Sequence, residues 1–171
     1  MLRLAKAFWD LALWRITPAQ LPASLFLLGL VTAAAALVEL AGALLPPVQS
    51  DRIAMRIALS VILPLIWTWT ILSVTRHRQR FLQTSSALLG VAALAELVLY
   101  PLGSLLNVFG LDHPAAIPLG FLSFVGLVWY LLACANIWRA ALNAGLSVGI
   151  AVSVGYLALS IVLEQFLLPE T

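Results

Sequence analysis

Five long runs of apolar residues divide the chain, and short segments richer in polar residues separate them. The runs cover about residues 21–45, 53–74, 85–106, 117–138 and 142–168. A helix needs roughly 20 apolar residues to cross a hydrocarbon core of about 30 Å, so each run is long enough to span a membrane. Because the runs do not alternate with polar residues, we predict helices and not barrel strands. The third run contains Pro101, Leu102 and Gly103, where we expect its helix to be interrupted.

The residues before the first run follow a different pattern. On a helix over residues 1–16, Arg3, Lys6 and Asp10 fall on one narrow stripe, and apolar and aromatic residues cover the remaining surface. Such a helix suits the headgroup layer of a membrane. The pattern predicts an all-α polytopic membrane protein, in which five transmembrane helices follow an N-terminal amphipathic interfacial helix. We expect residues 1–171 to form one integral membrane domain.

Composition removes the soluble alternatives. The chain is 63% hydrophobic and 9% charged, whereas an ordinary globular domain is about 45–50% apolar and about 25% charged. A soluble protein of this length could not bury so much apolar surface. The net charge of +2 is too small for a nucleic-acid-binding surface, so we expect no nucleic acid partner. The single cysteine, Cys134, excludes an intrachain disulfide.

Basic residues predict the orientation, because Lys and Arg collect in cytoplasmic segments. If the N-terminus is cytoplasmic and the C-terminus outside, seven basic residues lie inside and two lie outside. The inside residues are Arg3, Lys6, Arg15, Arg76, Arg78, Arg80 and Arg139, and the outside residues are Arg52 and Arg56. We therefore predict a cytoplasmic N-terminus. The short loops favour a bacterial inner (cytoplasmic) membrane.

Some of these basic residues are candidates for contact with lipid headgroups. They are Arg76, Arg78 and Arg80 in one short turn, with Arg3 and Lys6 near the N-terminus. Basic residues beside a span attract anionic lipids by about 1 kcal/mol each. A role in setting the orientation alone is an equally good interpretation, so both stay open.

Four ionisable residues lie within the predicted spans, and all four fall in the outer half of the membrane: Glu39, Arg56, Glu96 and Glu164. Such residues are expensive in hydrocarbon and are functional candidates by default. Arg56 and Glu39 lie on adjacent spans joined by a short loop, so we predict an ion pair in which the guanidinium forks onto the carboxylate. Glu96 is then left in apolar surroundings, where desolvation favours its protonated form.

These four residues allow two interpretations. In one, Arg56–Glu39 is a structural tie between helices, Glu96 is protonated, and Glu164 reaches the outer surface. In the other, Glu39, Glu96 and Glu164 form a proton or cation site. The two differ in whether Glu96 faces a hydrated cavity or packed protein.

Other chemistry is not indicated. His77 and His113 lie in loops, so they cannot hold a haem within the bilayer, and no metal, cofactor or catalytic motif is expected. We therefore predict that the protein is not an enzyme. Gly145 and Gly149 begin a stripe of small residues that permits close approach of helices. The partner of that stripe is either another helix of the same chain or a second subunit.

The plan resembles the Yip family of small five-span membrane proteins, including its bacterial members. The segment Trp14-Arg15-Ile16-Thr17-Pro18-Ala19-Gln20-Leu21-Pro22 is similar to the proline-bearing lead-in common in that family. The family's eukaryotic members carry a long cytoplasmic N-terminal region, where this chain has about sixteen residues. The resemblance therefore implies topology, and neither a role in vesicle trafficking nor any site residue is carried over from it.

Two functions follow as hypotheses. The first is a non-enzymatic integral membrane protein that acts as a scaffold, an assembly factor or a small subunit of a membrane complex. The second is a small homo-oligomeric transporter or channel, in which the outer-half carboxylates couple to protons or cations. The first accounts for the small-residue stripe and the interfacial helix, and the second accounts for the intramembrane carboxylates.

Overall fold

A computed structural model of the chain describes residues 2–45 and 53–167, with side chains from residue 6 onward. The described part is all-α, with six α-helices and two short 3-10 helices. The helices are α1 (Leu2–Ala12), η1 (Pro18–Gln20), α2 (Leu25–Ala43), α3 (Ile53–Val74), η3 (Arg78–Arg80), α4 (Phe81–Phe109), α5 (Ala116–Leu142) and α6 (Leu146–Leu167). Helices α2 to α6 are long and apolar enough to cross a membrane. The prediction of five spans after a short N-terminal helix is confirmed.

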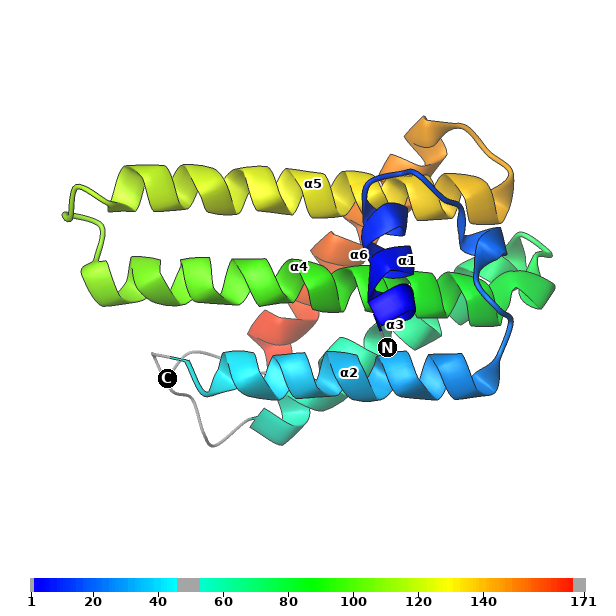
Figure 1. The fold of residues 1–171 in the computed structure, drawn as a ribbon, viewed down its shortest axis with the longest axis horizontal. Helices are drawn as coiled ribbons and strands as arrows, with labels where there is room; N and C mark the ends of the chain where they lie inside the picture. Colours follow the sequence, from blue (N-terminus) through cyan, green and yellow to red (C-terminus); the bar gives the residue numbers. More distant parts are fainter. Residues whose placement is uncertain (1, 46–52, 168–171) are drawn as a thin grey trace.

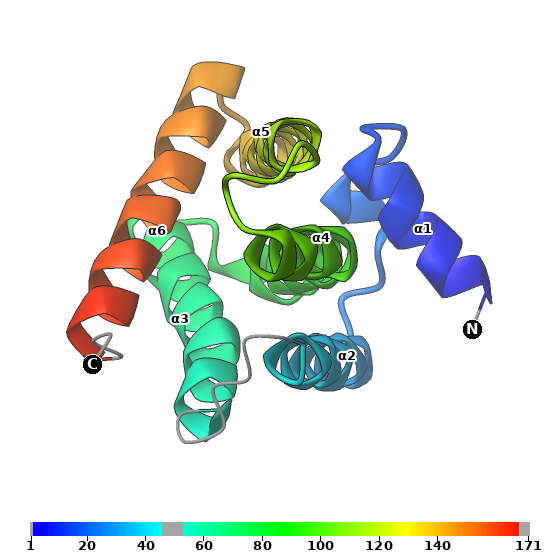
Figure 2. The same ribbon diagram turned by 90° about the vertical axis from the view of Figure 1, so that its left-hand side faces the viewer.

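The helices form three layers (Figures 1 and 2). Helices α5, α4 and α2 lie side by side in a central layer, which Figure 2 shows end-on as a column. Helices α3 and α6 cross one face of this layer, and α1 lies on the opposite face. Helix α4 is in the middle, because it contacts α2 and α5 in its own layer, α3 on one face and α1 on the other.

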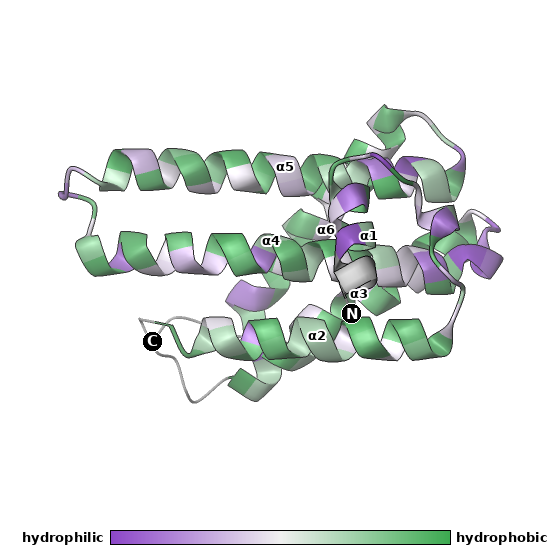
Figure 3. Cartoon of the chain, in the orientation of Figure 1, coloured by the Kyte–Doolittle hydropathy of each residue, from purple (hydrophilic) through white to green (hydrophobic). Residues whose placement is uncertain are grey.

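The two ends of the bundle differ in polarity. One end carries the turns that join α3 to α4 and α5 to α6, together with Arg76, Arg78, Arg80 and Arg139, and we call it the basic end. The other end holds the turn between α4 and α5, and we call it the distal end. In Figure 3 the long helices are mainly apolar and polar residues gather at the basic end. This pattern suits helices that lie in lipid.

The third span is longer than predicted and has no break. Helix α4 continues through Pro101, and it ends only at Gly110, which has a φ of 76°. A proline removes one backbone hydrogen bond, and the remaining bonds of a long apolar helix still have to be made within it in lipid. The predicted interruption at Pro101-Leu102-Gly103 is therefore wrong, and α3 likewise continues through Pro64.

The protein core lies toward the basic end. Leu72, Leu89, Ile137 and Trp138 are almost completely buried there. The distal half of the α4–α5 hairpin instead exposes large apolar side chains, among them Val108, Ile117, Phe121 and Phe124. Exposed apolar surface of this kind is covered by lipid in a membrane protein, so helix packing is concentrated in only one half of the bundle.

Helix α1 packs on protein. Phe8, Leu11 and Ala12 are buried, and the Phe8 ring lies on Gly90 of α4, where a Cβ atom would collide with it. The rings of Trp9 and Trp129 are 6.3 Å apart between their centroids. The apolar face that the sequence assigns to the headgroup layer therefore covers α4 and α5 to a large extent. Lys6 lies on the exposed side of α1.

Candidate functional site

Polar groups gather at two neighbouring places inside the bundle. The first is a cluster of Glu39, Arg56 and Tyr100, which we call the distal triad. The second is a cavity between the central layer and the α3–α6 layer, which Glu96 lines, and we call it the inter-layer cavity. Helix α4 contributes to both, because Tyr100 follows Glu96 by one helical turn.

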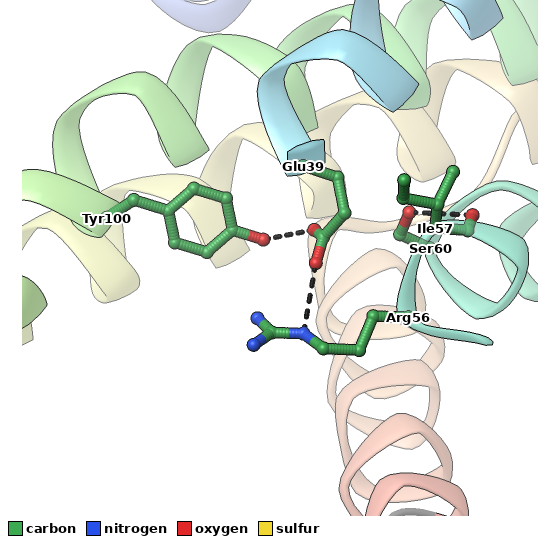
Figure 4. A network of polar contacts seen from close by, with 5 residues as sticks. All are labelled: Glu39, Arg56, Ile57, Ser60 and Tyr100. Atoms are coloured by element: carbon green, nitrogen blue, oxygen red, sulfur yellow. Dashed lines mark hydrogen bonds and ion pairs between the residues drawn. The ribbon is translucent and has the colours of Figure 1, made fainter. Parts of the chain in front are cut away.

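In the distal triad, one carboxylate has two partners (Figure 4). Glu39 is only 4% exposed, and its Oε1 atom lies 3.2 Å from Nε of Arg56. Its Oε2 atom accepts a hydrogen bond from the hydroxyl of Tyr100. The structure thus brings together the two residues predicted to pair. Each carboxylate oxygen has a different neighbour, however, so the expected fork of Arg56 onto both oxygens is replaced by one contact from each side.

The local sequence makes room for this arrangement. Gly42 lies one turn after Glu39 on α2, and the Tyr100 ring occupies the space that a Cβ atom at Gly42 would need. On α3, the Ser60 hydroxyl donates to the Ile57 carbonyl at 3.0 Å, as Figure 4 shows beside Arg56. Tyr100 is the member that the sequence interpretation missed. The available signals were a glycine three residues after one intramembrane glutamate and a tyrosine four residues after another.

The inter-layer cavity has a volume of about 60 Å³. Residues of α3, α4, α5 and α6 line it, so all four helices that surround it contribute to its wall. The polar and aromatic members of the wall are Trp67, Thr68, Glu96, Tyr130, Cys134, Trp138, Ser153 and Tyr156. Glu96 therefore does not lie in purely apolar surroundings, as the sequence suggested, but at a mixed polar and aromatic cavity.

Several buried polar atoms of the cavity residues have no hydrogen-bond partner in the protein. They are Nε1 of Trp67, Oγ1 of Thr68, Oε2 of Glu96 and Oγ of Ser153. A buried polar group without a partner costs about 1–3 kcal/mol, so four around one cavity are unusual. Groups of this kind are ordinarily satisfied by buried water or by a ligand. The cavity therefore has polar groups that a buried water molecule or a ligand could satisfy.

The wall of the cavity contains one carboxyl group, that of Glu96, and no basic side chain among the described residues. The charges of Glu39 and Arg56 act on Glu96 from the neighbouring triad with opposite signs. Because Arg56 is already paired with Glu39, the positive charge nearest to the cavity is largely neutralised locally.

Glu164 lies apart from both places. It is on α6, its side chain is exposed, and it is not among the residues that line the cavity. Arg56 and Glu39 influence it only through their charges. Of the three carboxylates predicted to form a proton or cation site, the structure places Glu96 at the cavity, Glu39 in the triad and Glu164 on the bundle surface.

Arg80 serves the fold at the basic end. Its Nη1 atom donates to the carbonyl oxygens of Ala140 and Ala141, both at 2.8 Å, and to Oδ1 of Asn143 at 3.0 Å. These carbonyls belong to the last turn of α5, where a helix leaves acceptors without helical partners. Arg80 therefore ties the beginning of α4 to the end of α5, and much of its hydrogen-bonding capacity is used inside the protein.

The other candidates for headgroup contact are more accessible. Arg76 and Lys6 are exposed. The guanidinium carbon of Arg78 lies 5.5 Å from the centroid of the Trp69 ring, which is a cation–π distance. The side chain of Arg3 lies outside the described part of the structure.

The two glycines of the small-residue stripe have different roles. Gly149 is buried on α6, and a Cβ atom there would collide with the backbone carbonyl of Ala135 on α5. Its partner is therefore a helix of the same chain. Gly145 precedes α6, is exposed, and would place a Cβ atom near only the Ser147 hydroxyl, at 3.6 Å. Gly145 therefore makes no close helix contact within the chain, because α6 begins after it, and its packing against a second subunit stays a prediction.

No metal centre is found in the part of the chain that the structure describes, since no three His, Cys, Asp or Glu side chains lie close enough to share an ion. Comparison with protein-family models, with curated proteins and with solved structures gave no match. The resemblance to the Yip family thus stands on the five long apolar helices and their order, and no family is assigned.

Proposed function

We propose that the protein is a small membrane carrier that binds protons or cations at Glu96. The observation that supports this proposal is the position of Glu96, whose Oε2 atom is buried without a partner beside the inter-layer cavity. An ionisable group within a membrane span is expensive and usually faces a partner or a water-filled space. A carboxylate with a free oxygen at a cavity has the chemistry of an exchangeable binding group.

The distal triad supports the same proposal by contrast. Both oxygens of Glu39 are engaged, so that side chain is held in a fixed place by Arg56 and Tyr100. Tyr100 lies one turn beyond Glu96 on α4 and donates to Glu39. Tyr100 thereby links Glu39 of α2 to the helix that carries Glu96, and the triad lies next to the cavity toward the distal end.

We also propose that more than one copy assembles for transport. The four helices that line the cavity leave a volume of only about 60 Å³, which is smaller than the ordinary range of ligand pockets, about 300–1,000 Å³. A continuous path across the membrane would then form between copies, at the exposed apolar faces of α3 and α6 that flank the cavity. The species carried is a proton or a small cation, in keeping with the carboxylate.

Flux measurements in liposomes test this proposal. Purified protein is reconstituted, and proton and monovalent-cation flux is followed in the wild type, in Glu96→Gln and in Glu164→Gln. We expect flux above that of empty liposomes in the wild type, loss of flux in Glu96→Gln and retention in Glu164→Gln, which changes a carboxylate outside the cavity. Equal flux in the wild type and Glu96→Gln would overturn the proposal.

A second candidate function is that of a scaffold, an assembly factor or a small subunit of a membrane complex, without enzymatic activity. The distal half of the α4–α5 hairpin favours it, because Ile117, Phe121 and Phe124 are large, exposed and adjacent on one helix. Co-purification in mild detergent with mass spectrometry of the intact assembly distinguishes the two functions. Foreign subunits in fixed stoichiometry support the second, and the protein alone or as a homo-oligomer supports the carrier.

A further inference from the structure

We infer that the inter-layer cavity binds a small organic ammonium cation, with Glu96 as its counter-ion and the rings of Trp67, Tyr130 and Tyr156 as its walls. This inference deepens the proposed function, since it names the class of cation. Transport of such a cation rests on the proposed function, but its binding to the cavity does not, because binding is measurable on its own.

The charge of the cavity is the first argument. When it is ionised, Glu96 supplies the negative charge in a wall that contains no basic residue among those described. In a water-poor site, an unpaired carboxylate is stabilised most by a cation in direct contact. The Oε2 atom of Glu96 is buried and has no partner in the protein, so a cation beside it would supply the missing contact.

The aromatic walls decide which cation fits. Trp67 of α3 and Tyr156 of α6 have ring centroids 6.3 Å apart, with their planes inclined at 53°. Two inclined rings at this spacing form a corner in which one cation can lie within about 6 Å of both centroids. Tyr130 of α5 lines the same cavity. Aromatic rings and a carboxylate are the combination that recognises ammonium groups carrying alkyl substituents.

Inorganic cations fit the wall less well. A bare metal ion requires a shell of several oxygen ligands at short distance. Besides Glu96, the side-chain oxygens of the wall are the neutral hydroxyls of Thr68, Tyr130, Ser153 and Tyr156, and the remaining wall is largely aromatic or aliphatic. An ammonium cation with alkyl groups does not need a shell of oxygen ligands, because its alkyl groups contact the aromatic rings. The composition of the wall therefore favours it.

The size of the cavity limits the ligand. A cavity needs about 10–15 Å³ for each water molecule by the same measure of volume, so one of about 60 Å³ holds roughly four to six non-hydrogen atoms. Tetramethylammonium has about five, and it carries a permanent charge over the whole pH range. It is therefore a suitable probe for the class.

A proton and the ammonium cation should compete, because both bind the same carboxylate. The titratable and charged groups around Glu96 come from every neighbouring helix: Glu39 of α2, Arg56 of α3, Tyr100 of α4, Tyr130 and Cys134 of α5, and Tyr156 of α6. Of these, Glu39 and Arg56 are tied to each other, and the tyrosines and the thiol are neutral acids in their ordinary state. Glu96 is thus the group at which protonation would expel the ligand.

The test is a thermal-unfolding titration of the full chain in detergent micelles. Tetramethylammonium chloride is added at constant ionic strength, with sodium chloride as the balancing salt. We expect a saturable rise of Tm with tetramethylammonium that sodium does not produce. The apparent Kd should increase as the pH falls, since the proton competes for Glu96. No difference between the two salts overturns the inference, and a pH-independent Kd overturns the competition.

Variants locate the site. Glu96→Gln should abolish the saturable rise, and Trp67→Leu should weaken binding about tenfold through loss of a cation–π contact. Trp69→Leu is the matched control, because Trp69 lies two residues further on α3, is 50% exposed, and does not line the cavity. Tyr156→Phe keeps the ring and should bind like the wild type. Equal weakening of tetramethylammonium binding in Trp67→Leu and Trp69→Leu would contradict the assignment of the ligand to this cavity.

The outcomes separate this inference from the proposed function. If flux depends on Glu96 but tetramethylammonium does not bind, the organic-cation inference fails and the carrier proposal stands. If tetramethylammonium binds in a Glu96-dependent way but no flux is found, the inference stands and the cavity belongs to a binding protein that does not transport.

Discussion

Glu39 and Glu96 are two carboxylates in neighbouring parts of one bundle, yet their surroundings are opposite. Glu39 has a basic partner on one oxygen and a hydroxyl donor on the other. Glu96 has a buried oxygen without a partner, beside a cavity whose wall contains three more unpartnered polar atoms. The comparison shows that an intramembrane carboxylate is informative through its partners. A satisfied one holds helices together, and an unsatisfied one is available for a ligand.

Helix α4 is the element that separates the two environments. Tyr100 faces α2 and completes the distal triad, whereas Glu96 faces the cavity formed with α3, α5 and α6. Glu96 and Tyr100 lie one turn apart on nearly the same face of α4, so the two environments follow one another along that helix. If this division is correct, changes in the triad should act on stability, and changes at the cavity should act on binding.

The largest loss of stability is expected when the triad loses its cation. Arg56→Ala leaves Glu39 as a buried carboxylate with only Tyr100 as partner. Breaking a buried pair costs about 3–5 kcal/mol, and we expect about 3 kcal/mol here because the Arg56 side chain is 31% exposed. The measurement is thermal unfolding in detergent, with Arg76→Ala at an exposed position as control. An unchanged Tm would show that the Arg56–Glu39 pair does not stabilise the fold.

A smaller loss is expected when α6 is pushed away from α5. In Gly149→Ala, the new methyl group meets the backbone of Ala135, which cannot move aside like a side chain. Overpacking of this kind costs about 1–3 kcal/mol. Since α6 carries Ser153 and Tyr156 in the cavity wall, tetramethylammonium binding should be lost together with stability.

Gly145→Ala is the matched control for that change, because its methyl group would meet only the Ser147 hydroxyl. It should leave both Tm and binding unchanged. A full retention of binding in Gly149→Ala would show that the distance between α5 and α6 does not determine the shape of the cavity.

Removing one hydroxyl from the triad should have a still smaller effect. Tyr100→Phe keeps the ring on Gly42 but removes the hydrogen bond to Glu39. A hydrogen bond to a charged group contributes about 1.5–3 kcal/mol, and we expect about 1.5 kcal/mol because Arg56 still holds the carboxylate. A double-mutant cycle with Glu39→Gln measures the coupling directly. Additive losses would mean that the contact between the two side chains contributes nothing.

The spans and the Arg56–Glu39 pair could be predicted because the relevant signals are local. The length of an apolar run determines whether it crosses a membrane, and a short connection between two spans brings Glu39 and Arg56 to adjacent helices. Helix packing is another matter. The spans are apolar on every side, so no polar face tells which side of α4 meets α2 and which meets α3. The contact of Tyr100 with Glu39 and the cavity at Glu96 both depend on that choice.

Two other misjudged positions have the same origin. Arg80 is a basic residue in a basic turn, and only the position of the α5 terminus beside it shows that its guanidinium binds carbonyl groups. Gly145 and Gly149 share one sequence pattern, but α6 begins between them. The pattern alone therefore could not assign the close contact to Gly149 and an exposed position to Gly145.

The smallest effect on stability, and the sharpest test of the comparison, is expected at Glu96. Glu96→Gln is nearly isosteric and removes no contact of the unpartnered Oε2 atom. We therefore expect a change within about 0.5 kcal/mol, the ordinary range for a substitution that breaks no specific interaction. The same substitution at Glu39 leaves Arg56 without its counter-ion and should cost clearly more. Paired unfolding curves of Glu96→Gln and Glu39→Gln decide the matter, because equal losses would make Glu96 a second structural carboxylate. A stable Glu96→Gln that has lost flux and ligand binding would assign the two carboxylates to different tasks within one bundle.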